Sequence, residues 1–151
     1  MVHGIFYVLD GLDDAQQLSL FCQVIAERWR ELGSVRVWCR DQKHAEALDE
    51  ALWQQPADAF VPHNLVGEGP SQGAPVEICW PEAPVGPRRC KVVINFMPTA
   101  PQFAGAQLVL DQVPSNPEAR QAARERFKWY RQQGVQLSTV NATELTQITA
   151  N

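Results

Sequence analysis

The sequence is poor in the residues that build metal and redox sites. Among its 151 residues there are three histidines and four cysteines, with no HExxH pattern and no CxxC pair. The cysteines are Cys22, Cys39, Cys79 and Cys90. Because they are widely spaced and have apolar neighbours, we interpret them as small buried side chains. We therefore expect no metal site and no cofactor.

Long hydrophobic runs are also absent. No segment approaches the roughly 18 apolar residues that a membrane-spanning helix needs, and the apolar segment near the start lacks the basic flank and cleavage site of a signal peptide. We expect no membrane partner and a cytoplasmic protein. The formal net charge is −4, so the chain as a whole has no general attraction to nucleic acid. Any contact with an anion must be local.

The usual nucleotide-binding and catalytic motifs are missing. The turn after the first predicted strand reads LDGLDD, with three acids and one glycine, where a bound phosphate needs glycines and free backbone amides. No GK[ST] sequence completes a P-loop, and there is no GxSxG nucleophile motif. We expect no catalytic residues and no enzyme activity, with a degenerate nucleotide-binding enzyme as the alternative.

Apolar runs alternate with amphipathic segments along the chain. The runs predict strands at Ile5–Leu9, Val35–Cys39, Val76–Trp80, Cys90–Phe96 and Gln107–Leu110, with a further edge strand at Val135–Thr139. The amphipathic segments predict three helices, which begin after the capping residues Asp13, Asp41 and Asn116. The segment Gln54–Ala74 is rich in glycine and proline, so we predict a loop there.

The alternation of strands and helices predicts the fold class. Two successive strand–helix units imply parallel strands joined by crossover helices. We predict a single three-layer, Rossmann-like α/β domain that has a mostly parallel sheet, covers residues 1–140 and lacks a nucleotide-binding loop. Residues 141–151 form a polar C-terminal tail, which we expect to be frayed.

Two blocks of sequence are more specific than any short motif. They are LDEALWQQPADAFVPHNLVGEGPSQGAPVEICWP, at Leu48–Pro81, and AARERFKWYR, at Ala122–Arg131. With weaker similarity over most of Ile5–Thr139, they make the chain resemble the chi subunit of the bacterial DNA polymerase III clamp-loader assembly. The resemblance implies a non-catalytic accessory subunit of the polymerase holoenzyme. Such a subunit bridges the clamp loader to single-stranded DNA-binding protein during DNA replication.

Large apolar side chains interrupt the predicted loop after the second helix. Trp53, Phe60 and the segment VPHNL can pack against the sheet or form an interaction surface, and the residues alone leave both interpretations open. The resemblance implies that Trp53 and Phe60 bind psi, the short subunit that joins chi to the clamp loader. It leaves open whether a helicase competes for the same surface.

The last predicted helix is strongly basic in an acidic chain. Its charged residues are five cations, Arg120, Arg124, Arg126, Lys128 and Arg131, and two acids, Glu118 and Glu125. Arg120, Arg124, Phe127 and Arg131 fall at offsets 0, 4, 7 and 11, so they share one helix face. This stripe can be a solvated basic face, or it can bind the carboxylates of an acidic peptide beside an apolar pocket.

The resemblance implies that this helix binds the acidic C-terminal tail of single-stranded DNA-binding protein, which ends in phenylalanine. The matching residues are Arg120, Arg124, Phe127 and Lys128, with Val113 as an apolar wall. Phe127 stands where tyrosine is common in the family, so we expect only packing from its ring. Direct binding of single-stranded DNA is a third alternative. The net charge and the lack of an aromatic-lined groove disfavour it, so we expect no specific DNA contact.

Overall fold

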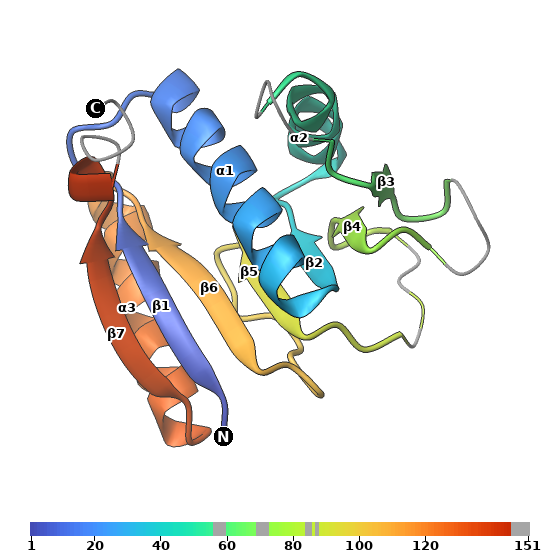
Figure 1. Ribbon diagram of the computed structural model, residues 1–151. Coiled ribbons are helices and arrows are strands. Elements are labelled where there is room, and N and C mark those ends of the chain that lie inside the picture. The colour runs from blue at the N-terminus through green and yellow to red at the C-terminus, as the bar shows by residue number, and fades with distance from the viewer. Residues whose placement is uncertain (56–59, 69–72, 84–85, 87, 146–151) are drawn as a thin grey trace.

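The computed structural model describes residues 1–55, 60–68, 73–83, 86 and 88–145. Figure 1 shows the elements in chain order. They are β1 (His3–Val8), α1 (Asp14–Leu32), β2 (Val35–Trp38), α2 (Gln42–Gln54), β3 (His63–Leu65), β4 (Val76–Cys79), β5 (Val92–Asn95), β6 (Leu108–Val113), α3 (Pro117–Gln132) and β7 (Gln136–Asn141).

The strands form one seven-stranded sheet in the order β3-β4-β2-β5-β6-β1-β7. Every neighbouring pair among the described strands is parallel. Helices α1 and α2 lie side by side on one face, and α3 covers β6, β1 and β7 on the other (Figure 1). The predicted three-layer, Rossmann-like α/β fold is therefore confirmed, with a sheet more uniformly parallel than expected.

Each face of the sheet carries its own apolar cluster. Because successive side chains of a strand point to opposite faces, Tyr7 joins the large cluster under α1 and α2, and Phe6 joins the smaller cluster under α3. The apolar run of the first predicted strand is thus used on both sides. The four cysteines are unpaired and buried, as interpreted from their neighbours. Burial raises the pKa of the Cys22 thiol to about 11.

The predicted helix starts are confirmed by their capping contacts. The Asp13 carboxylate accepts from the backbone N–H of Gln16, and the Gln16 side chain accepts from the backbone of Asp13. This reciprocal pair is a capping box, which satisfies amide groups that the helix itself leaves free. Asp41 caps α2 in a similar way, and Asn116 caps α3 ahead of a proline at its first turn.

Two expectations need correction. The predicted loop Gln54–Ala74 contains β3, which pairs with β4 and buries Leu65, while Val61 just before it is fully buried. The sequence predicts a frayed tail from residue 141, but β7 runs to Asn141 and residues 142–145 continue in helical conformation with Ala142 fully buried. Residues 146–151 lie outside the described part of the chain.

Within the part of the chain that the structure describes, no helix is both long and apolar enough to cross a membrane. The same residues contain no cluster of three or more His, Cys, Asp or Glu side chains that could hold a metal ion.

Candidate functional site

A buried ion pair anchors α3 to the sheet. Two nitrogens of the Arg126 guanidinium donate to the Asp111 carboxylate of β6 over 3.0–3.2 Å, and a third donates to the Pro98 carbonyl over 3.0 Å. Tyr130 Oη donates to the same carboxylate over 2.9 Å, and Asn95 Nδ2 over 3.0 Å. Arg126 is 4% exposed and Asp111 1% exposed. This network fixes how α3 is rotated on the sheet, because a paired buried charge cannot turn to solvent without leaving its partner.

The same contacts shift the pKa values of Asp111 and Tyr130. Burial raises the pKa of the Asp111 carboxyl, and the charge and hydrogen bonds of Arg126 act to lower it. Burial and the charge of Asp111 raise the pKa of Tyr130, so its hydroxyl stays a donor. The sequence gives Arg126 only as one of the five cations of the last helix, outside the stripe of Arg120, Arg124, Phe127 and Arg131, and the structure buries it against Asp111. The signal that could have indicated it is an aspartate inside an otherwise apolar strand, since strands are depleted in aspartate.

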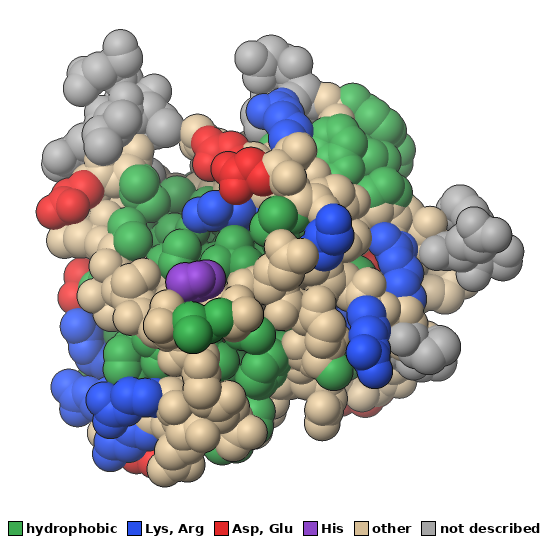
Figure 2. Space-filling model, turned by 60° about the horizontal axis from the view of Figure 1, so that its bottom comes forward, with side chains coloured by type: hydrophobic (Ala, Val, Ile, Leu, Met, Phe, Trp, Pro, Cys, Tyr) green, Lys and Arg blue, Asp and Glu red, His purple; other side chains and the backbone are tan. Residues whose placement is uncertain are grey.

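The remaining cations of α3 lie at the surface. Arg120 donates to the Asp10 carboxylate over 2.8 and 3.1 Å. Lys128 Nζ lies 3.9 Å from the Glu125 carboxylate, and Arg124 contacts the Gln121 side-chain oxygen over 3.5 Å. Figure 2 shows cationic side chains gathered at the lower left of the molecule, the side on which α3 and β7 lie in Figure 1. Arg124 and Lys128 are thus only loosely held, whereas Arg120 already has a carboxylate partner.

Apolar side chains adjoin these cations. The Phe127 ring is half-buried and meets the Phe6 ring edge to face, with 5.2 Å between ring centroids. Val113, at the end of β6, packs against the same apolar cluster as Phe127. The structure therefore brings the predicted apolar wall and the predicted aromatic side chain onto one cluster, beside a helix that carries Arg120, Arg124 and Lys128.

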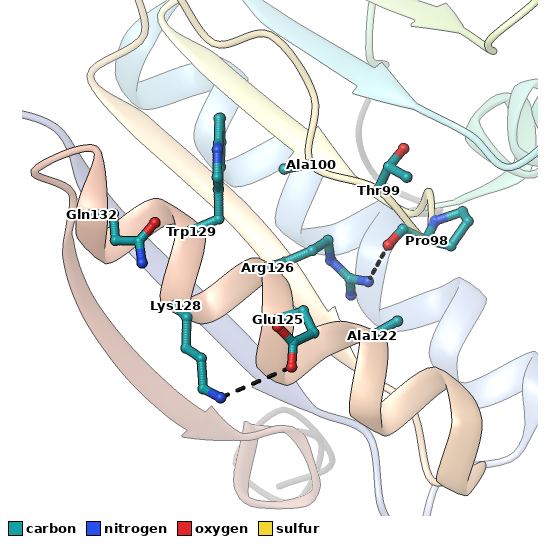
Figure 3. Close-up of a pocket in the computed structure, with 9 residues that line it drawn as sticks. All are labelled: Pro98, Thr99, Ala100, Ala122, Glu125, Arg126, Lys128, Trp129 and Gln132. Carbon is teal, nitrogen blue, oxygen red and sulfur yellow. Dashed lines mark hydrogen bonds and ion pairs between the residues drawn. The ribbon is translucent and has the colours of Figure 1, made fainter.

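A groove that the sequence does not predict runs along the other flank of α3. It has a volume of about 720 Å³. Figure 3 shows its lining residues, which are Pro98, Thr99, Ala100, Ala122, Glu125, Arg126, Lys128, Trp129 and Gln132. Trp129 is 38% exposed, and Lys128 stands on the rim that faces the basic stripe. The groove forms between α3 and the segment after β5, so no local pattern could predict it.

The aromatic pair predicted to bind a partner is exposed. Trp53, near the end of α2, is 59% exposed, and Phe60, just before β3, is 65% exposed. Their ring centroids are 5.8 Å apart. The other large apolar side chains nearby, Val61 and Leu65, are buried. The segment therefore packs against the sheet through Val61 and Leu65 and leaves the rings of Trp53 and Phe60 outside, and their role as an interaction surface stays a prediction.

A pocket of about 390 Å³ lies at the carboxyl ends of β1, β2, β5 and β6. Folds of this kind bind nucleotides at this edge. Here the Asp13 carboxylate caps α1, whose first residue, Asp14, lines the pocket. A carboxylate already fills the position in which a helix start would hold a phosphate. Burial and the nearby charge of Arg40 lower the pKa of His44, in the same pocket, to about 4.

Comparison with known families gives one consistent result. The family model of the DNA polymerase III chi subunit, HolC, matches residues 1–138. The Escherichia coli K12 protein named DNA polymerase III subunit chi is 46% identical over 144 residues, which cover 92% of this chain and 97% of that protein. The Haemophilus influenzae protein of the same name is 35% identical over 140 residues, 90% of this chain and 94% of that one.

Solved structures share the fold at much lower identity. The C-terminal domain of the DEAD-box protein Dbp5 has a TM-score of 0.68 at 11% identity, over 97% of this chain and 94% of that one. T4 UvsW has a TM-score of 0.60 at 10% identity, over 93% of this chain and 41% of that one. Likeness at this level of identity concerns the architecture alone.

Proposed function

Because the chain belongs to the DNA polymerase III chi subunit family, we propose that it is a non-catalytic adaptor that joins the clamp loader to single-stranded DNA-binding protein. Family membership associates it with the replication machinery. The adaptor role rests on one observation. The exposed aromatic pair adjoins β3, at one end of the sheet, and the basic helix packs on β6 and β7 at the other end and on the opposite face. Two partners can therefore bind at once.

The basic helix is the proposed site for an acidic peptide tail. Arg124 and Lys128 are exposed and loosely paired, so they can form charge-assisted hydrogen bonds with carboxylates of the tail. Val113 and Phe127 supply the apolar contact for its terminal phenylalanine. Arg120 can join once a peptide carboxylate replaces Asp10 as its partner. The Phe127 ring contributes packing only.

The aromatic pair is the proposed site for psi. Trp53 and Phe60 form an exposed patch on a segment whose other large apolar side chains are buried. Large aromatic side chains are enriched among the residues that dominate binding energy at protein interfaces. Docking psi here leaves α3 uncovered. We place this assembly in the cytoplasm, where bacterial replication takes place.

A degenerate nucleotide-binding enzyme is the rival function. The capped start of α1 and the acids of the turn that precedes it argue against it. A thermal-shift screen with ATP, GTP, NAD and zinc tests it, because a real ligand raises the melting temperature in a saturable way. We expect no such shift.

A capture experiment tests the adaptor directly. The acidic tail peptide is immobilised, and psi is applied alone or with the protein. We expect psi to be retained only when the protein is present, and Arg124→Ala or Phe60→Ala to abolish retention. Retention of psi without the protein, or no retention with it, contradicts the bridge. An immobilised single-stranded oligonucleotide serves as the control, and strong capture on it would favour direct DNA binding.

A further inference from the structure

His63 lies against Trp53, one of the two exposed aromatic rings, and its side chain is buried. Its side chain has 0% exposure, although it is the first residue of β3 and next to a surface patch. Its ring centroid is 4.8 Å from that of Trp53. His63 is thus the buried support on which one of the two exposed aromatic rings rests.

Both nitrogens of the His63 ring face oxygen atoms. Nδ1 lies 2.6 Å from the Val61 carbonyl oxygen, and Nε2 lies 3.0 Å from the Asp49 carbonyl oxygen and 3.4 Å from the Asp49 carboxylate. A neutral imidazole donates from one nitrogen and has a lone pair on the other, whereas an imidazolium donates from both. A neutral ring would therefore set a lone pair against a carbonyl oxygen, and a doubly protonated ring makes both hydrogen bonds.

The charged groups around the His63 ring also favour its doubly protonated form. Among the described residues, Asp49 of α2 is a charged side chain that contacts the ring; burial raises the pKa of the Asp49 carboxyl, and the charge on His63 acts to lower it. On the remaining side, the Trp53 indole lies within the distance, about 6 Å, at which a cation is attracted to an aromatic ring. Among the described residues, the contacts of the ring thus include two carbonyl oxygens, a carboxylate and an indole.

We propose that His63 is a positioning residue that holds Trp53 in its exposed place by donating from both ring nitrogens, so that loss of one proton loosens the surface. The two hydrogen bonds tie the α2 backbone at Asp49 to the start of β3. Trp53 stands one turn after Asp49 on the same helix. The consequence for psi rests on the proposed function, in which Trp53 and Phe60 form the docking surface.

Tryptophan fluorescence tests this in the free protein. An imidazolium quenches a neighbouring indole more than a neutral imidazole does, and imidazoles change charge in a range that a titration from about pH 5 to about pH 9 covers. The difference between wild type and Trp53→Phe isolates the Trp53 signal among the five tryptophans. We expect this signal to rise with pH in wild type and to lose that dependence in His63→Gln. His3→Gln, on the exposed end of β1, is the control and should keep it.

Imidazole nitrogen chemical shifts give a second measurement, which needs no variant. They count the protons on His63 in wild type, so the proposal stays testable even where His63→Gln fails to fold. We expect two protons at low pH and the loss of one at the pH where Trp53 responds. A ring that keeps one proton, or an unchanged number of protons, across the titration overturns the proposal, as does a pH response that survives in His63→Gln.

Binding of purified psi separates this proposal from the proposed function. If His63 positions the surface, psi affinity should fall as pH rises in wild type, by about tenfold if one buried hydrogen bond is lost, and stay flat in His63→Gln. If psi fails to bind at any pH, the docking function is wrong, while fluorescence and chemical shifts still decide the role of His63. Tight psi binding with the same pH profile in both proteins overturns the positioning role.

Discussion

The two proposed surfaces are built in opposite ways. The basic helix is anchored to the sheet by the buried Asp111 carboxylate, which accepts hydrogen bonds from Arg126 and Tyr130. Its outer face carries loosely paired cations. Trp53 near the end of α2 and Phe60 just before the three-residue β3 are exposed, and Trp53 contacts the buried His63 imidazole. An anchored helix with loosely paired surface cations suits a short charged peptide, which supplies its own carboxylates. Exposed aromatic rings that are held by fewer buried contacts suit a larger partner that covers them.

Removing the Arg126–Asp111 ion pair tests whether it anchors α3 to the sheet. Arg126→Ala leaves the Asp111 carboxylate buried without its cation, which typically costs about 3–5 kcal/mol. Urea denaturation should show a loss of this size. Arg131→Ala, an exposed cation on the same helix, is the matched control and should change stability by less than about 0.5 kcal/mol. A similar small effect of both variants would show that the ion pair does not anchor α3.

Binding of the acidic tail should depend on the Arg126–Asp111 ion pair. Since Arg126 fixes the rotation of α3, Arg126→Lys should keep the charge but weaken tail binding, because lysine cannot make the two-pronged contact with Asp111. The peptide affinity of this variant, measured where it remains folded, reports on the anchoring of α3, since Arg126 is 4% exposed and paired with Asp111.

The aromatic surface should respond to truncation without loss of the fold. Phe60→Ala removes an exposed ring, and truncating a central aromatic anchor costs about 2 kcal/mol or more in binding. We expect psi affinity to fall at least about 30-fold, measured by calorimetry, with an unchanged melting temperature. Trp129→Ala removes an exposed aromatic ring from the other region and should leave psi binding intact. Unfolding of Phe60→Ala would mean that Phe60 supports the core instead.

The basic surface should respond to loss of one cation. Arg124→Ala removes a charge-assisted hydrogen bond worth roughly 1.5–3 kcal/mol, or about a 10- to 150-fold loss of tail affinity, while fold stability stays constant because Arg124 is exposed. Fluorescence polarisation with a labelled tail peptide measures this. Arg30→Ala, an exposed arginine of α1, is the control.

The same assay asks whether the tail needs more than charge. Removing the terminal phenylalanine of the peptide should also weaken binding, since Val113 and Phe127 offer an apolar contact. Indifference to both the Arg124 change and the missing phenylalanine would contradict the tail site. Tight binding of naked single-stranded DNA would favour the rival in which these cations hold phosphates.

Local signals explain what the sequence could predict. Apolar runs such as Ile5–Leu9 and caps such as Asp13 act within a few residues, so β1 and the start of α1 follow from the sequence. The β3 strand has three residues and too little pattern to reveal itself. The fate of Arg126 depends on Asp111, which lies 15 positions earlier and meets it only after folding.

The two candidate surfaces depended on different information. The basic stripe follows from helical spacing, and the sequence could locate it without the structure. The exposure of Trp53 and Phe60 could not be derived, because the same residues are equally suited to a core. The contact between the Trp53 and His63 rings needs the return of the chain from the loop to β3. Contacts between distant segments are therefore what the sequence left undetermined.

The smallest effect is expected at Asp10, whose carboxylate already pairs with the Arg120 guanidinium. Asp10 pairs with Arg120 at the surface, where such pairs are worth about 0.2–1 kcal/mol. Asp10→Asn should free Arg120 for the acidic tail and raise tail affinity by up to about fivefold. Removing a negative charge helps any acidic ligand, so Asp14→Asn, an exposed carboxylate at the start of α1, measures that general contribution and should give a smaller gain.

A double-mutant cycle then assigns the gain to Arg120. If Asp10 competes with the peptide for this guanidinium, Asp10→Asn should increase tail affinity in wild type. It should not do so in Arg120→Ala, because that variant lacks the guanidinium for which Asp10 and the peptide compete. Fluorescence polarisation at low ionic strength gives the four affinities, since salt screens an exposed pair. Equal gains in the presence and absence of Arg120 would mean that the tail binds without it, and that only Arg124 and Lys128 hold its carboxylates.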